Sequence, residues 1–201
     1  MSKPVIAILI LAAGSSSRMD DIKQLLPWKG KPLINHAVEA ATGTKAAKVA
    51  VVLGANAPLI REAIIGAGSS GVAIYENKNW EQGMGNTIAC GMKALSEAGS
   101  GLDGVLLMLC DQPLIDANYL VEMIRTFNPH ENEIVATRYR HHAGVPALFS
   151  RNYFPELLHL HGDTGAKALL ARHGKDCIVL DAGNRTMDID TKEDYEGLQR
   201  G

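Results

Sequence analysis

Short apolar runs alternate along the chain with segments in which apolar residues recur every three or four positions. A short continuous apolar run predicts a buried strand, and the longer spacing predicts an amphipathic helix. The predicted strands are residues 5–11, 47–53, 71–75, 104–109, 133–137, 145–149 and 177–180. The predicted helices are residues 32–42, 58–65, 84–98 and 116–127, a pair within 151–172, and one that starts at Thr191.

This alternation of strand and helix predicts the fold class. Strands joined through helices form βαβ units, which give a mainly parallel sheet with helices on both faces. The uninterrupted apolar run at 104–109 is typical of a strand buried on both faces of such a sheet. We therefore expect a three-layer α/β/α fold of Rossmann-like type. No linker or repeat interrupts the pattern, so we expect one domain over residues 1–201.

Composition and charge exclude several classes of protein. With 46% hydrophobic and 21% charged residues, the chain is typical of a globular protein. Its formal charge of -2 leaves no basic excess to bind a nucleic acid polymer or an anionic membrane. The N-terminal apolar run is too short to span a bilayer and lacks the features of a signal peptide. We therefore expect a cytoplasmic protein that binds neither a nucleic acid polymer nor a membrane.

A loop of small residues follows the first predicted strand. It reads Leu11-Ala12-Ala13-Gly14-Ser15-Ser16-Ser17-Arg18-Met19, and Lys23 follows shortly after. Small side chains let backbone N–H groups approach an anion, and Arg18 and Lys23 supply positive charge. Taken alone, the serines are also typical of an ordinary surface loop. The fingerprints G-x-G-x-x-G and G-x-x-x-x-G-K-[ST] are absent, which argues against a dinucleotide oxidoreductase and a P-loop NTPase.

An acidic residue, Asp111, follows the strand predicted at 104–109. In open α/β sheets, ligands bind beyond the carboxyl ends of the strands, where the Ser-rich loop also lies. Asp111 is therefore a candidate ligand for Mg²⁺, which commonly takes one or two carboxylates together with substrate phosphates. The alternative is a helix N-cap, a role for which Asp116 is better placed.

Three further segments carry polar residues of interest. Asp188 and Asp190 alternate on a segment expected to be extended, so they share one face, and Thr191 is placed to cap the helix that follows. The glycines at 83 and 85 open a helix, and ordinary turn chemistry explains them as well as function does. The histidines at 141, 142, 159 and 161 lack partners at metal-site spacing, so surface or acceptor-pocket positions are favoured.

From Leu11 to Lys23, and on through Gly30-Lys31-Pro32-Leu33, the chain resembles the MobA-like nucleotidyltransferases, which activate sugars, isoprenoid precursors and pterin cofactors. Their opening is L-A-(A/G)-G, a Ser-rich turn, R-M and a Lys, and Asp20 departs from it where Gly is usual. The resemblance implies a single nucleotidyltransferase domain. It also implies the nucleotide-binding residues Leu11, Ala12, Ala13, Gly14, Ser15, Ser16, Arg18, Lys23, Gly83, Gly85 and Thr87.

The same resemblance implies a mechanism. Arg18 and the loop backbone would hold the β- and γ-phosphates, and Lys23 would stabilise charge at the α-phosphate. Asp111 would carry Mg²⁺ with a second carboxylate, for which Asp190 is preferred to Asp188. The catalytic residues implied are therefore Arg18, Lys23 and Asp111. Transfer of this kind needs in-line positioning and charge neutralisation rather than a nucleophilic side chain.

Two later segments resemble the acceptor-side motifs G-x-P-x-L-F and G-D-x-G-A-(R/K) of molybdenum cofactor cytidylyltransferases. They imply that Gly144, Pro146, Asp163 and Lys167 bind a molybdopterin-type acceptor, with helix capping as the alternative for Asp163. The A-A-G form of the loop is associated with cytosine and the A-G-G form with guanine, which favours CTP.

The implied reaction is the Mg²⁺-dependent transfer of CMP from CTP to the phosphate of molybdopterin, with release of pyrophosphate. The alternatives are GTP as donor, a different phosphorylated acceptor, and a molybdopterin-binding chaperone without activity. Transient docking to a molybdoenzyme or its chaperone is left open.

Overall fold

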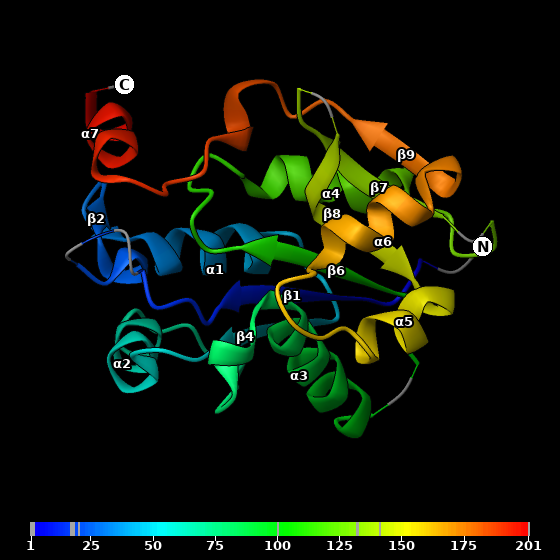
Figure 1. Cartoon of the computed structure of the whole chain (residues 1–201), viewed down its shortest axis with the longest axis horizontal. Helices are drawn as coiled ribbons and strands as arrows, with labels where there is room; N and C mark the ends of the chain where they lie inside the picture. The colour runs from blue at the N-terminus through cyan, green and yellow to red at the C-terminus, as the bar shows by residue number, and fades with distance from the viewer. Residues whose placement is uncertain are drawn as a thin grey trace.

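The computed structural model describes residues 3–16, 19, 21–99, 101–131, 133–140 and 142–200. Seven strands form one sheet in the order β5-β4-β1-β6-β8-β7-β9 (Figure 1). Their bounds are β1 (Ile6–Ala12), β4 (Lys48–Leu53), β5 (Val72–Glu76), β6 (Gly104–Leu109), β7 (Ile134–Arg138), β8 (Ala143–Ser150) and β9 (Cys177–Leu180). β5, β4, β1 and β6 pair in parallel, and β9 pairs in parallel with β7. β8 is antiparallel to both neighbours, β6 and β7, so the predicted mainly parallel sheet is confirmed.

Helices cover both faces of this sheet (Figure 1). One layer holds α1 (Leu33–Gly43), α2 (Ala57–Gly66) and α4 (Ala117–Thr126). The other holds α3 (Met84–Glu97), α5 (Phe154–Leu158) and α6 (Ala166–Arg172). A further helix, α7 (Lys192–Arg200), packs through Leu198 against a small separate cluster. The predicted three-layer α/β/α fold is thereby confirmed.

The central strand β1 explains why its sequence is apolar throughout. Its alternate side chains point to opposite faces, so Ile8 and Ile10 join the α1 layer while Leu9 and Leu11 join the α3 layer. All of these side chains are buried. A strand covered on both faces loses the apolar and polar alternation of a half-exposed strand.

The ends of several elements are set by local chemistry. Asp116 caps α4 by accepting a hydrogen bond of 2.8 Å from the backbone N–H of Tyr119, as predicted. Thr191 and Asp194 exchange hydrogen bonds at the start of α7, which confirms the predicted cap. Helix capping by Asp163, the alternative to an acceptor role, is not observed: Gly165 occupies the N-cap position of α6, without a side-chain bond.

Some short elements were not predicted. A 3-10 turn at Lys23–Leu25 follows the Ser-rich loop, and a two-residue hairpin pairs β2 (Pro27–Trp28) with β3 (Lys31–Pro32). Further 3-10 turns are Trp80–Gln82, Arg151–Tyr153, Gly174–Asp176 and Gly183–Thr186. These elements are too short to produce a periodic hydrophobic pattern.

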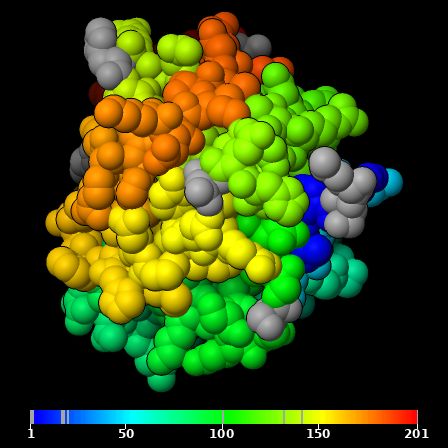
Figure 2. All heavy atoms as spheres, turned by 90° about the vertical axis from the view of Figure 1, so that its right-hand side faces the viewer, coloured from blue at the N-terminus to red at the C-terminus, as the bar shows by residue number. Residues whose placement is uncertain are grey.

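The parallel strands β1, β4 and β6 begin at one end of the molecule, and the candidate site described below lies at the other end. Figure 2 shows this end, where the segment that contains α5 (yellow) lies between β9 (orange) and α3 (green). A groove of about 620 Å³ lies here, and its lining includes Lys3, Lys45 and Arg125. Within the described ranges, no helix has the length and apolar character needed to cross a membrane.

Candidate active site

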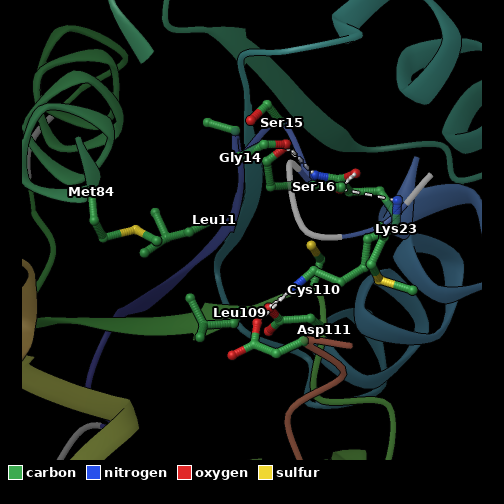
Figure 3. Close-up of a pocket in the computed structure, with 14 residues that line it drawn as sticks. Leu11, Gly14, Ser15, Ser16, Lys23, Met84, Leu109, Cys110 and Asp111 are labelled. Atoms are coloured by element: carbon green, nitrogen blue, oxygen red, sulfur yellow. Dashed lines mark hydrogen bonds and ion pairs between the residues drawn. The ribbon is translucent and has the colours of Figure 1, made fainter. Parts of the chain in front are cut away.

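A cavity of about 320 Å³ opens at the carboxyl ends of β1 and β6 (Figure 3). Its wall is formed by residues 11–16 and 109–111, joined by Lys23, Gln24, Met84 and Asp190. Met84 and Leu11 lie on one side of the cavity and Lys23 on the other (Figure 3). The parallel strands thus bring the Ser-rich loop and Asp111 to one edge of the sheet.

The described part of the Ser-rich loop is held in place by Gln24. The Gln24 side chain is 2% exposed, and its amide donates hydrogen bonds to the carbonyl oxygens of Gly14 (2.8 Å) and Ala12 (3.4 Å). Ser16 Oγ donates to Gln24 Oε1 and accepts from the backbone N–H of Lys23. Sequence reasoning missed Gln24, whose only signal is a polar residue before two leucines.

These contacts leave the donors of the loop available. Among the described residues, none accepts a hydrogen bond from the backbone N–H groups of Gly14, Ser15 or Ser16. Several adjacent free N–H groups beside a cavity form a concave site for an anion such as a phosphate. Ser17, Arg18 and Asp20 lie outside the described residues, so the role of Arg18 stays a prediction.

Lys23 lies between two carboxylates. Its Nζ is 2.7 Å from Oδ2 of Asp111 and 3.0 Å from Oδ1 of Asp190. The side chains of Lys23 and Asp111 are 14% and 16% exposed, and that of Asp190 is 43% exposed. Burial by itself would lower the pKa of Lys23, but the charge and hydrogen bond of Asp111, followed by those of Asp190, hold that pKa above its ordinary value. The ammonium is therefore charged at neutral pH.

Asp190 reaches this site through a buried neighbour. Ile189 is fully buried in a cluster with Leu26, Leu33 and Leu198, and its N–H donates to the carbonyl oxygen of Asp111 (3.0 Å). This bond joins the segment before α7 to the end of β6. Asp188 and Asp190 flank Ile189, and both face the cleft as the predicted alternation requires.

The two aspartates nevertheless line different cavities. Asp190 lies in the first, with Lys23 and Asp111, whereas Asp188 lies in a second cavity of about 270 Å³. The lining of the second cavity includes the predicted acceptor residues Gly144, Asp163 and Lys167. The two cavities are contiguous, because Leu11, Met84 and Leu109 line both.

Pro146 is not part of the lining of the second cavity. It is buried behind the cavity, its carbonyl oxygen accepts a hydrogen bond from Thr137 Oγ1 (2.7 Å), and the adjacent Val145 lines the cavity instead. Sequence reasoning also missed Gln112, Tyr139 and Val145 in this wall. His142, considered only as a surface or acceptor-pocket residue, lines the cavity as well.

The residues predicted at the start of α3 lie beside the cavities without lining them. A Cβ on Gly83 would come within 2.5 Å of the Gly162 carbonyl, and one on Gly85 within 2.7 Å of the His161 backbone. Both glycines thus let two loops approach closely. Thr87 is buried and pairs with Asn77 at 3.2 Å. Met84 is the residue of this turn that lines both cavities, and the nucleotide roles of the other three stay predictions.

The site holds two carboxylates suited to a cation. Lys23 already places one positive charge between Asp111 and Asp190, and Asp111 Oδ1 is buried without a hydrogen-bond partner in the described part of the chain. Within the described ranges, no group of three or more His, Cys, Asp or Glu side chains could hold a metal by itself. The two carboxylates fit an ion that commonly takes one or two carboxylates together with substrate phosphates, as Mg²⁺ does.

Comparisons with known proteins give the family. A model described as the MobA-like NTP transferase domain matches residues 8–177. The purine catabolism protein PucB of Bacillus subtilis is 26% identical over 212 residues, which cover 100% of this chain and 98% of PucB. The bifunctional protein GlmU of Pelobacter propionicus is 37% identical over 122 residues, or 59% of this chain. That match covers 25% of GlmU, so this chain resembles about a quarter of its length.

Solved structures show the same fold. Rv0371c from Mycobacterium tuberculosis H37Rv superimposes with a TM-score of 0.79 at 30% identity, covering 98% of both chains. Its complex with manganese gives a TM-score of 0.74 at 28% identity, again over 98% of both chains.

Proposed function

The chain belongs to the MobA-like NTP transferase family, whose domain is a nucleotidyltransferase domain, and we propose that it transfers CMP from CTP to the phosphate of molybdopterin. In this reaction a phosphate oxygen of the acceptor attacks the α-phosphorus of CTP, and the bond from that phosphorus to pyrophosphate breaks. We also propose that residues 1–201 form a single nucleotidyltransferase domain, because one sheet draws its strands from Ile6 through Leu180.

The observation that carries this proposal is the pair of contiguous cavities. A transfer between two bound substrates needs adjacent sites that hold the reacting groups in line. The first cavity offers the charge of Lys23 and the N–H groups of Gly14, Ser15 and Ser16, which donate to none of the described residues; both suit a triphosphate. The second offers Lys167, which suits the phosphate of an acceptor. Leu11, Met84 and Leu109 lie where the two substrates would meet.

On the nucleotide side, the chain's own groups perform three tasks. The N–H groups of Gly14, Ser15 and Ser16, with Arg18, would hold the β- and γ-phosphates. Lys23 would place its ammonium against the charge that develops at the α-phosphate. Gln24 keeps the loop in the shape that presents these donors.

Asp111 and Asp190 would hold a divalent metal ion, for which we propose Mg²⁺. The ion would supply positive charge to the triphosphate and orient it for displacement. Asp111 is the more buried of the two, and its orphaned Oδ1 is the oxygen that lacks a partner in the described part of the chain. No covalent intermediate with the protein is required.

The choice of CTP rests on the Ala12-Ala13-Gly14 form of the loop. Both alanines line the first cavity at the end of β1. The resemblance to the family associates this form of the loop with cytosine, because backbone groups at this position would meet the Watson–Crick edge of the base.

A panel of nucleotides tests the proposal. The protein is incubated with molybdopterin, Mg²⁺ and CTP, GTP, ATP or UTP in turn, and pyrophosphate release is measured. We expect CTP to be preferred by at least about tenfold. Equal or better use of GTP would overturn the assignment of the base. Turnover with another phosphorylated acceptor but not with molybdopterin would overturn the acceptor. Binding of molybdopterin without pyrophosphate release from any nucleotide would favour a chaperone.

A further inference from the structure

The second cavity contains a hydrogen-bonded network that the assignments above do not use. It joins Gln112, at the end of β6, to Tyr139, after β7, and to Asp188, before α7. These residues are far apart in sequence, and all three line the cavity. Their arrangement determines which groups a ligand meets there.

The direction of each hydrogen bond in this network follows from its donors. Tyr139 donates its hydroxyl hydrogen to the carbonyl oxygen of Val145 at 2.7 Å. Its oxygen must then accept from the Gln112 amide, which lies 2.5 Å away. The second hydrogen of that amide goes to Asp188 Oδ1 at 2.7 Å. Both hydrogens of Gln112 are therefore used, and the amide holds the Asp188 carboxylate in one orientation.

That orientation leaves an acceptor for a ligand. Asp188 Oδ2 accepts no hydrogen bond from the residues that the structure describes, and it is not among their buried unpaired atoms. The Asp188 side chain is part of the cavity wall. A ligand in this cavity therefore meets a fixed carboxylate oxygen rather than a donor.

Two stacked aromatic rings belong to the same cavity wall as this carboxylate. The rings of Tyr139 and His142 stack with centroids 5.3 Å apart and an angle of 12°. Gly144 makes room for this stack, because a Cβ there would lie 2.6 Å from the Tyr139 ring. Apolar side chains, among them Ile88 and Val145, complete the wall. Flat and apolar surfaces of this kind suit a planar ring.

We propose that Asp188 is a specificity-determining residue that accepts hydrogen bonds from the N–H edge of a planar heteroaromatic acceptor, as presented by the aminopyrimidinone ring of a pterin. Gln112 and Tyr139 are positioning residues that hold the carboxylate. The inference rests on the proposed function, because it places the ring of the acceptor in the same cavity as Lys167. It also separates the two aspartates, since Asp190 serves the nucleotide side and Asp188 the acceptor side.

The test measures binding of a pterin monophosphate by quenching of its fluorescence, without nucleotide or metal. Asp188→Asn keeps an oxygen for Gln112 and turns an N–H group toward the ligand in place of the free oxygen. We expect this variant to bind the pterin at least about tenfold more weakly. Removal of a negative charge would by itself favour an anionic ligand, so weaker binding is not explained by the phosphate. Asp181→Asn is the control, because Asp181 is exposed and lines neither cavity, and Asn keeps the oxygen that accepts from the Gly183 N–H; this variant should bind the pterin as the unaltered protein does.

A second measurement needs no variant. The same pterin monophosphate, with two methyl groups on its exocyclic amine and one on the adjacent ring nitrogen, lacks the N–H edge. We expect the unaltered protein to bind this analogue at least about tenfold more weakly, and Asp188→Asn to bind both ligands alike. Equal binding of the two ligands by the unaltered protein, or unchanged pterin affinity in Asp188→Asn, overturns the role of Asp188 alone. If the unaltered protein binds no pterin, the proposed acceptor fails and the inference fails with it.

Discussion

Replacement of Lys23 by methionine tests the electrostatics of the site directly. Methionine keeps much of the length of the side chain but removes the charge that lies between Asp111 and Asp190. Two carboxylates would then face each other without a counter-ion. The variant should lose stability in the absence of metal, and it should regain stability when a divalent cation replaces the ammonium.

The loss of stability expected in Lys23→Met depends on how far its ion pairs are buried. Breaking a buried ion pair by removing one partner costs about 3–5 kcal/mol, whereas exposed pairs contribute about 0–1 kcal/mol. Lys23 and Asp111 are 14% and 16% exposed, which places this pair nearer the buried limit, while Asp190 is partly open to solvent. We therefore expect Lys23→Met to lower the free energy of unfolding by about 2–3 kcal/mol in EDTA. Ligand at a hundred times its dissociation constant adds about 2.7 kcal/mol, so saturating Mg²⁺ should offset most of the loss.

Urea unfolding followed by circular dichroism, in EDTA and in excess Mg²⁺, measures both effects. Lys31→Met is the matched control, because it removes an exposed pair with Glu39. The control should lose at most about 1 kcal/mol relative to the unaltered protein, and this loss should be the same in EDTA and in Mg²⁺. A Lys23→Met protein as stable as the unaltered one, or a deficit that is the same in EDTA and in Mg²⁺, would refute the view that ammonium and metal serve the same carboxylates.

Three other changes have defined outcomes. Asp111→Asn should reduce pyrophosphate release from CTP by about a hundredfold or more, and undiminished release would remove Asp111 from the metal site. Gln24→Met should lower the free energy of unfolding by about 1–3 kcal/mol, because the Gly14 carbonyl loses its donor. This variant should also raise the KM for CTP but not the KM for the acceptor. An unchanged KM for CTP would contradict the role of Gln24 in the loop. In urea unfolding, Gly85→Ala should destabilise the protein by about 1–3 kcal/mol, because the new Cβ clashes with the His161 backbone. The control Gly66→Ala has open space at its Cβ and should not destabilise the protein. Equal effects of the two substitutions would contradict the close approach of the Gly85 and His161 backbones.

The sheet and its helices could be predicted because their signals are repeated along many residues. The strand predicted at 104–109 coincides with β6, whose neighbours on both faces require apolar side chains throughout. The strand at 177–180 coincides with β9, which lies at the edge of the sheet and is a short β-rich run between polar segments. Ends of the other elements shift by one or two residues, since caps and turns set them rather than the pattern.

The candidate site was predictable only in part, because several of its residues act singly. Gln24 follows Lys23 and Gln112 follows Asp111 in the sequence, and nothing in their spacing indicates that one glutamine holds the loop and the other holds Asp188. Thr87 is polar and follows a glycine-rich turn, yet it faces Asn77 in the interior. Such roles depend on contacts between segments far apart in sequence, which local patterns do not record.

Asp188 and Asp190 line different cavities because side chains alternate on either side of one buried residue, Ile189. Ile189 is fixed in the cluster beneath α7 and bonded to the Asp111 carbonyl, so residues 188 and 190 both face the cleft, one step apart along it. Across the cleft, the neighbours Asp111 and Gln112 diverge in the same way, Asp111 toward Asp190 through Lys23 and Gln112 toward Asp188. Substitution of Asp188 or Gln112 should therefore change the use of the acceptor, and substitution of Asp190 or Asp111 the use of the nucleotide. Loss of the Ile189 side chain should weaken the use of both substrates.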